Sequence, residues 1–184
     1  MKNLIITIAI ICAAVIAAVA QPRAIGARAG YNFEVSYQHE LANGMLEVDA
    51  GFSPFLFQKG VMYDIDGNPM EQTYHYGRAQ ITLVYDGLMN ITPNLNWYIG
   101  PAVGVSWGYG EFFDIPHYDK NGNLTTYRRL GLPAGGQIGL EYNFDFPLNL
   151  SLDWRPMFNI FGLRQGDLVP NLLNIAAGIR YRFS

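Results

Sequence analysis

The sequence predicts an all-β fold: a transmembrane, antiparallel, up-and-down β-barrel of eight strands that follows a cleaved signal peptide. Three observations support this prediction. Segments of about ten residues alternate between apolar and polar side chains, the apolar positions carry no charge, and aromatic residues gather at the segment ends. Strands of soluble proteins also alternate, so the segment length, the aromatic ends and the uncharged face are what favour lipid.

The N-terminal segment has the order of a secretory signal peptide. Lys2 is followed by an uncharged apolar run that closes on small residues at Ala18 and Ala20. A positive start, an apolar stretch and a small-x-small ending are typical of such leaders, whereas a retained membrane anchor, the alternative, is usually longer. We expect residues 1–20 to be removed on export by the Sec pathway and residues 21–184 to form one barrel domain. Cys12 lies in the leader, so the mature chain has no cysteine.

Charge and hydropathy exclude two other classes. The chain has 12 Lys and Arg against 15 Asp and Glu, a net charge of −3 at pH 7, and therefore no basic surface for nucleic acid. After the leader no long apolar run remains for a membrane helix. The 20 glycines and 14% aromatic residues fit a barrel with an apolar outside.

The order of strands and connections predicts the number and direction of the strands. The alternating segments are 25–38, 46–53, 79–86, 96–108, 132–143, 148–158 and 174–183. The connections are short at 39–44, 87–94 and 145–147, and long at 57–76, 110–128 and 160–171. Short turns of outer-membrane barrels are periplasmic and long loops extracellular. An even strand number then requires a split near residues 30–32. The alternative, one long first strand, would leave unpaired edge groups in the bilayer.

The inward positions carry charges of both signs. Eight strands enclose a space only wide enough for side chains, and buried charges need partners. We therefore expect a polar network that fills the lumen. Its members are Arg28, Glu34, Glu47, Asp49, Glu141, Asp153, Arg155, Arg180 and Arg182. A conducting or ligand-holding lumen is the alternative.

Aromatic residues and prolines mark the strand ends. Two interfacial belts are expected, with Tyr37, Tyr85, Trp97, Tyr142 and Phe183 at the periplasmic ends and Phe52, Trp107, Tyr109 and Phe158 at the outer ends. Three prolines fall within predicted strands, at Pro101, Pro133 and Pro156. Because each removes a donor from the ladder, we expect bulges or strand ends there.

The C-terminal stretch 174–184, NIAAGIRYRFS, carries a further pattern. Together with GPAVG and IGLEYNFDFPLNLSLDWRP it resembles the small eight-stranded outer-membrane barrels of the OmpA/OmpX-like superfamily, over essentially the whole mature chain. The resemblance implies that Gly178, Tyr181 and Phe183 form the signal read by the barrel-assembly machinery, although such chains commonly end on the aromatic residue and here Ser184 follows. It also implies the outer membrane of a Gram-negative bacterium, in contact with phospholipid and lipopolysaccharide.

The outer loops hold the other candidate sites. Residues 63–68 contain the pair Asp66-Gly67 and residues 118–123 the pair Asn121-Gly122. Both pairs are typical of hairpin tips, and we expect these hairpins to continue the strands beyond the membrane. Clustered Asp and Asn oxygens also suit calcium, but the glycine comes at the fourth position and not at the sixth. His75, His117 and Ser106 could belong to a lipid-modifying enzyme, although their spacing matches no catalytic motif.

We therefore expect a non-enzymatic, monomeric membrane anchor without cofactor or metal. Its outer hairpins, 57–76 and 110–128, would bind an extracellular ligand or serve envelope integrity. The alternatives are a lipid A-modifying hydrolase or acyltransferase and a narrow channel.

Overall fold

The computed structural model describes residues 22–41, 44–64, 66, 68–114, 117–118, 121–125, 128–161 and 173–183. The expected leader, residues 1–20, and most of the third long connection lie outside these ranges. Within the described ranges, no helix is long and apolar enough to cross a membrane.

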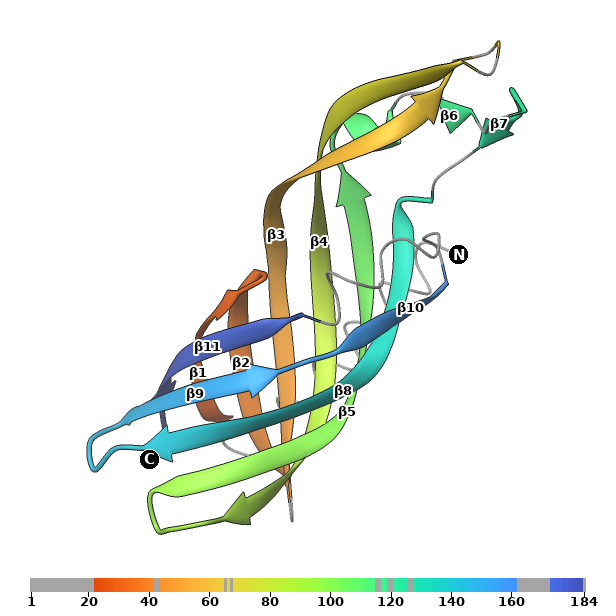
Figure 1. The fold of residues 1–184 in the computed structure, drawn as a ribbon. Coiled ribbons are helices and arrows are strands. Elements are labelled where there is room, and N and C mark those ends of the chain that lie inside the picture. Colours follow the sequence, from red (N-terminus) through yellow and green to blue (C-terminus); the bar gives the residue numbers. More distant parts are fainter. Residues whose placement is uncertain are drawn as a thin grey trace, which may run out of the picture.

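Eight antiparallel strands close into a barrel, as Figure 1 shows. They are β1 (Pro22–Gly30), β2 (Phe33–Leu41), β3 (Gly44–Tyr63), β4 (Pro69–Asn90), β5 (Leu95–Tyr109), β8 (Leu130–Asn143), β9 (Leu148–Trp154) continued by β10 (Met157–Phe161), and β11 (Ile175–Arg182). Neighbours in this order pair with each other, and β11 pairs with β1 to close the ring. Because β9 and β10 keep one register on β8, they count as one barrel strand.

The predicted eight-stranded closed barrel is confirmed, and so is the split of the first segment. β1 ends at Gly30, β2 begins at Phe33, and the Gly30 amide donates to the Asn32 carbonyl oxygen at 3.0 Å across the turn. One long first strand could not have placed a partner on both sides of every strand. The tight turn therefore removes the open edge that seven strands would leave.

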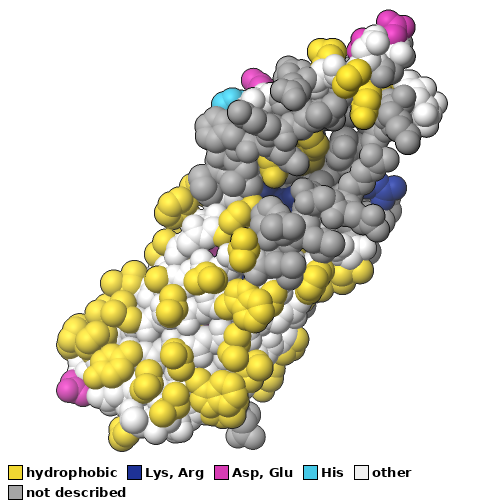
Figure 2. Space-filling model, viewed as in Figure 1, with side chains coloured by type: hydrophobic (Ala, Val, Ile, Leu, Met, Phe, Trp, Pro, Cys, Tyr) yellow, Lys and Arg dark blue, Asp and Glu magenta, His cyan; other side chains and the backbone are white. Residues whose placement is uncertain are grey.

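The wall of the barrel is apolar outside and polar inside. Along β9 and β11 exposed and buried residues alternate strictly over most of the strand. The exposed positions are apolar, for example Val35 (61% exposed) and Leu152 (58%), whereas Glu47 and Arg155 are fully buried. Figure 2 shows hydrophobic side chains spread over the lower wall, with acidic groups at the lower left tip and near the top of the molecule. Among the described residues, the buried apolar cluster inside the barrel is small and consists of Val84, Ala102 and Met157.

The two ends of the barrel differ in their connections. β2 ends and β3 begins at one end of the barrel, where the connections 91–94 and 144–147 also lie and β11 finishes (Figure 1). We call this the short-connection end. At the opposite end, the hairpin end, β3 and β4 continue well past the other strands. The prediction that residues 57–76 form an outer hairpin that continues the strands is confirmed: the arms stay paired from Leu56 opposite Tyr76 to Tyr63 opposite Pro69.

The second long connection does not extend its strands, contrary to the expectation of a hairpin that continues them. β5 stops at Tyr109, and Gly110 has a φ of 105°, a conformation that turns the chain away at little cost only for glycine. A 3-10 turn, η1 (Glu111–Phe113), follows. A small hairpin of β6 (His117–Tyr118) and β7 (Leu124–Thr125) then pairs with β3, where Tyr63 lies opposite Tyr118.

The three prolines behave differently from one another. The strand stops at Arg155 and Pro156 as expected, and a register shift between Asn159 and Phe161 lies opposite Pro133. The bulge expected at Pro101 was wrong, because β5 runs through it without a shift. Its missing amide falls in a gap of the β4–β5 ladder, between the Val84–Ala102 and Gly87–Ile99 pairs.

Candidate functional site

The middle of the lumen is filled by a buried guanidinium, that of Arg155. Its Nη2 donates to Glu47 Oε1 at 2.7 Å and to Asp49 Oδ2, and its Nε donates to Gln137 Oε1. Glu34 Oε2 lies 3.8 Å from Nη1. Side chains from β2, β3, β8 and the β9–β10 junction thus meet around one cation.

Arg180 joins the same layer from β11. Its Nη2 donates to Glu47 Oε2 at 3.1 Å, its Nη1 to Ser151 Oγ at 2.7 Å and its Nε to Ser36 Oγ at 2.9 Å. Gln38 Nε2 also donates to Glu47 Oε2, at 2.6 Å. The carboxylate of Glu47 therefore bridges two arginines, so the strands that carry them are cross-linked through the lumen.

A third arginine, Arg28, holds the part of the network nearer the hairpin end. It pairs with Asp153 and with Glu34, and all three side chains are fully buried. Gln80 Nε2 donates to Glu34 Oε1 at 2.6 Å, and the Tyr98 hydroxyl reaches Asp153 Oδ2 at 3.5 Å. The acids and bases of this level are mutual partners, which offsets the cost of burying each charge.

A separate cluster surrounds Glu141 at the short-connection end. Arg23 forms a forked ion pair with Glu141 and donates to Gln38 Oε1 at 2.9 Å. Asn96 and Asn149 donate to the same carboxylate at 2.9 and 3.1 Å. This layer adds a second polar cluster on the short-connection side of the arginine network.

Of the nine charged residues expected in the lumen network, Arg182 lies elsewhere. Its side chain is half-buried at the rim, where Nη2 donates to the Phe144 carbonyl oxygen at 2.6 Å. The strand parity was right, but β11 ends at Arg182 and its side chain therefore reaches over the edge. Conversely, the sequence analysis missed Arg23, which precedes the first alternating segment. Arg23 and Arg28 are an odd number of residues apart, so strict alternation would place their side chains on opposite faces of the strand, yet both point inward. A register shift between Pro22 and Ala24 explains this.

Several buried polar atoms on the β4–β5 side have no hydrogen-bond partner among the described residues. They are Thr82 Oγ1, Asp86 Oδ1 and Ser106 Oγ. Asp86 Oδ2 accepts from Gln137 Nε2 at 3.0 Å. Other such atoms lie toward β9 and β11, among them Asn149 Oδ1, Asn174 Oδ1 and Arg182 Nε. Within the described residues the network therefore leaves polar atoms without partners on both sides of the lumen.

An aromatic cap covers the lumen at the hairpin end. The rings of Tyr76, Phe112 and Phe113 are mutual neighbours, with centroids 5.3 to 6.5 Å apart. Arg129 pairs with Asp114, and its guanidinium lies 5.7 Å from the centroid of the Phe113 ring. Gly108 provides the space, since a Cβ there would come within 2.3 Å of the Phe113 ring.

Most residues of the expected aromatic belts lie on the outer wall. Six of them are clearly exposed: Phe52, Tyr85, Trp107, Tyr142, Phe158 and Phe183. Tyr37 and Trp97 are half-exposed. Tyr109 is half-buried and its hydroxyl donates to the Ser53 carbonyl oxygen at 2.9 Å, so it fastens β5 to β3.

The residues of the expected assembly signal have distinct surroundings. Tyr181 and Phe183 are exposed on the wall and their rings meet edge to face at 5.4 Å. Gly178 faces inward, where a Cβ would lie 2.4 Å from Ser151 Oγ. Glycine here makes room for the hydrogen bond between Ser151 and Arg180.

Two of the catalytic candidates, Ser106 and His75, are not brought together. Ser106 is buried in the lumen and lies opposite Gln80 of β4, whereas His75 is five positions farther along β4 and its side chain is exposed. An odd offset places His75 on the opposite face from Gln80. The side chain of His117 lies outside the described part.

The tip of the β3–β4 hairpin is organised by Asp64. Its carboxylate accepts from the Asp66 and Asn68 amides at 2.9 and 2.8 Å and from Asn68 Nδ2 at 2.9 Å. In the described ranges, no group of three or more His, Cys, Asp and Glu side chains is arranged to hold a metal ion. The Asp64 carboxylate therefore stabilises the turn through these hydrogen bonds.

One edge of the hairpin is open in the described part of the chain. The pairing of β2 with β3 stops at Phe33 opposite Phe52, and β3 continues to Tyr63 with β4 on one side only until β6 meets it at Tyr63. An unpaired edge offers backbone amides and carbonyl oxygens to another strand.

No family model, curated protein or solved structure matches this chain.

Proposed function

We propose that this protein is a non-enzymatic β-barrel of a bacterial outer membrane, which anchors the protruding β3–β4 hairpin as an interaction surface. The observation that carries the proposal is the reversed polarity of the wall. Large apolar side chains such as Ile81, Val103 and Leu140 are exposed, while Glu47 and Arg155 are fully buried. Water-soluble proteins rarely expose a continuous apolar surface around the whole body, and a bilayer would cover it.

The proposed binding mode is strand addition. The free edge of β3 beyond Phe52 would pair with an extended segment of an extracellular partner, and exposed side chains such as Met70 would contact it. The short-connection end would then face the periplasm, because its connections are the short ones.

The first experiment asks whether the barrel needs a lipid-like environment. We expect protein lacking residues 1–20 to stay monodisperse only with detergent or lipid, and to show a folded β spectrum there. A monodisperse, folded monomer in plain buffer would contradict the membrane location.

The second experiment concerns the hairpin. Replacing residues 58–74 by a two-residue Asn-Gly turn should leave the barrel folded in detergent, because the network of the lumen lies below this hairpin. We then compare the parent protein with this variant for the adhesion of cells that carry it to surfaces and for its binding of envelope proteins. Both should be weaker for the variant. Unchanged binding would argue against the hairpin as the interaction surface.

The enzyme and the channel remain the alternatives. A lipid A mass spectrum with and without the protein tests the first, since a changed acyl pattern would favour a lipid-modifying enzyme. Conductance across a planar bilayer tests the second. We expect no stable current, because the arginine network and the aromatic cap both obstruct the lumen.

A further inference from the structure

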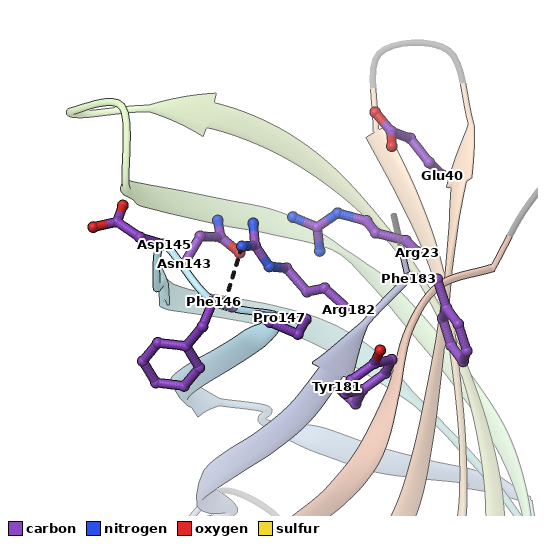
Figure 3. Close-up of a pocket in the computed structure, with 9 residues that line it drawn as sticks. All are labelled: Arg23, Glu40, Asn143, Asp145, Phe146, Pro147, Tyr181, Arg182 and Phe183. Atoms are coloured by element: carbon purple, nitrogen blue, oxygen red, sulfur yellow. Dashed lines mark hydrogen bonds between the residues drawn. The ribbon is translucent and has the colours of Figure 1, made fainter.

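A cavity of about 510 Å³ lies at the short-connection end (Figure 3). Four charged residues line it: Arg23 of β1, Glu40 of β2, Asp145 of the β8–β9 turn and Arg182 of β11. Figure 3 shows the two arginines reaching toward its middle, between Asp145 on one side and Glu40 on the other. The cavity thus presents both signs of charge at the rim.

Arg182 is a cation without a carboxylate partner in the described part of the chain. Its Nη2 donates to the carbonyl oxygens of Phe144 and Phe146, at 2.6 and 3.4 Å, and its buried Nε makes no hydrogen bond there. Arg23 differs, because Glu141 already neutralises it. The backbone of the turn positions the Arg182 guanidinium and leaves its charge for an anion.

The two carboxylates are also weakly engaged. Among the described residues Asp145 accepts one hydrogen bond, from Asn94 Nδ2 at 3.4 Å, and Glu40 makes no side-chain contact of this kind. Both residues are exposed. A ligand that fits one uncompensated cation flanked by two acids carries an anionic group and a cationic donor a few bonds apart.

The outer side of the same cavity is aromatic. Tyr181 of β11 and Phe183, which follows β11, are exposed, and Phe146 of the turn is 56% exposed. The cavity therefore joins a polar rim to an apolar wall. That combination matches the headgroup and the first acyl carbons of a lipid.

We propose that this cavity binds the phosphoethanolamine headgroup of a phospholipid, with the phosphate on Arg182 and the ammonium on Glu40 or Asp145. The inference rests on the proposed function, which places this end at a bilayer surface. Guanidinium forks match phosphate oxygens, and a primary ammonium donates hydrogen bonds to carboxylates.

Native mass spectrometry of the protein released from micelles tests the proposal. The micelles contain equal amounts of phosphatidylethanolamine, phosphatidylcholine and phosphatidylglycerol. We expect phosphatidylethanolamine to be retained most, since the quaternary ammonium of phosphatidylcholine cannot donate a hydrogen bond and phosphatidylglycerol has no cation. Arg182→Gln should lower its retention about tenfold, the effect of losing one charge-assisted contact. Glu40→Gln with Asp145→Asn should lower it to the phosphatidylcholine level.

Arg129→Gln at the hairpin end is the matched control and should leave retention unchanged. Equal retention of the three lipids, preference for phosphatidylglycerol, or an unaffected Arg182→Gln variant would overturn the inference. If equimolar soluble glycerophosphoethanolamine displaced the lipid, the claim that the ligand is a membrane lipid would be overturned. None of these results depends on the detergent requirement, which tests the proposed function separately.

Discussion

Arg155 illustrates how single residues hold this barrel together. Its guanidinium donates hydrogen bonds to acids of β3 and an amide of β8 and lies 3.8 Å from the Glu34 carboxylate of β2, and each of those groups is buried. A buried charge is favourable only while its partners are present, so the network behaves as a unit. The outer wall has no such dependence, because its side chains are interchangeable apolar groups.

We predict that Arg155→Met lowers the free energy of unfolding by about 3–5 kcal/mol, because Asp49 would remain buried without a cation and Glu47 would keep only Arg180. Urea unfolding of the barrel in vesicles measures this loss. Arg128→Met, an exposed residue near the hairpin end, is the control and should stay close to the parent. A loss equal to that of the control would mean that the network contributes no net stability.

The elements differ in how far the sequence predicts them. Alternation is a local property, so the eight strands and their facing could be predicted. The small connection η1 could not, because its place depends on Gly108 and Phe113 meeting across a turn. The partner of Arg23 was equally hidden, since Glu141 lies 118 residues away and only the register of the closed sheet brings them together. The continuation of β3 and β4 into an outer hairpin could be predicted, because the Asp-Gly turn signal near its tip is also a local property.

The cap can be displaced by one methyl group. Gly108→Ala would place a Cβ about 2.3 Å from the Phe113 ring. We expect chymotrypsin to cut faster after Phe112 or Phe113 in this variant, while the strands stay protected. Gly87→Ala is the control, since its Cβ would meet only the Ile99 carbonyl oxygen, at 3.7 Å. Equal cleavage of both variants would argue against a packed cap.

Taken whole, the molecule places its charges inside and its apolar side chains outside, and this arrangement makes the proposed environment testable by substitution. Leu152 belongs to the wall, between Leu140 and Ala177 of the neighbouring strands. Leu124 belongs to β7, away from the wall, and is at least as exposed.

We predict that Leu152→Arg lowers the unfolding free energy in vesicles by about 2–4 kcal/mol, the cost of a cation near the middle of a bilayer. Leu124→Arg should change it little. Folding yield into vesicles, followed with urea, compares the two. If both substitutions had equally small effects, the wall would be exposed to water, and the proposed membrane location would be contradicted.

The pairing of β1 with β11 has a consequence for synthesis. Residues 24–30 of β1 pair with residues 176–182 of β11. On that side, the backbone hydrogen bonds of the first strand can form only after the last strand has been synthesised. Ring closure is therefore the slowest kind of contact to form, joining the most distant segments, and an unfinished chain stays open along that line. Since the Phe183 amide also donates to the Arg23 carbonyl oxygen at 3.1 Å, the two ends could be spliced and the chain reopened at residues 91–94 without altering the cylinder.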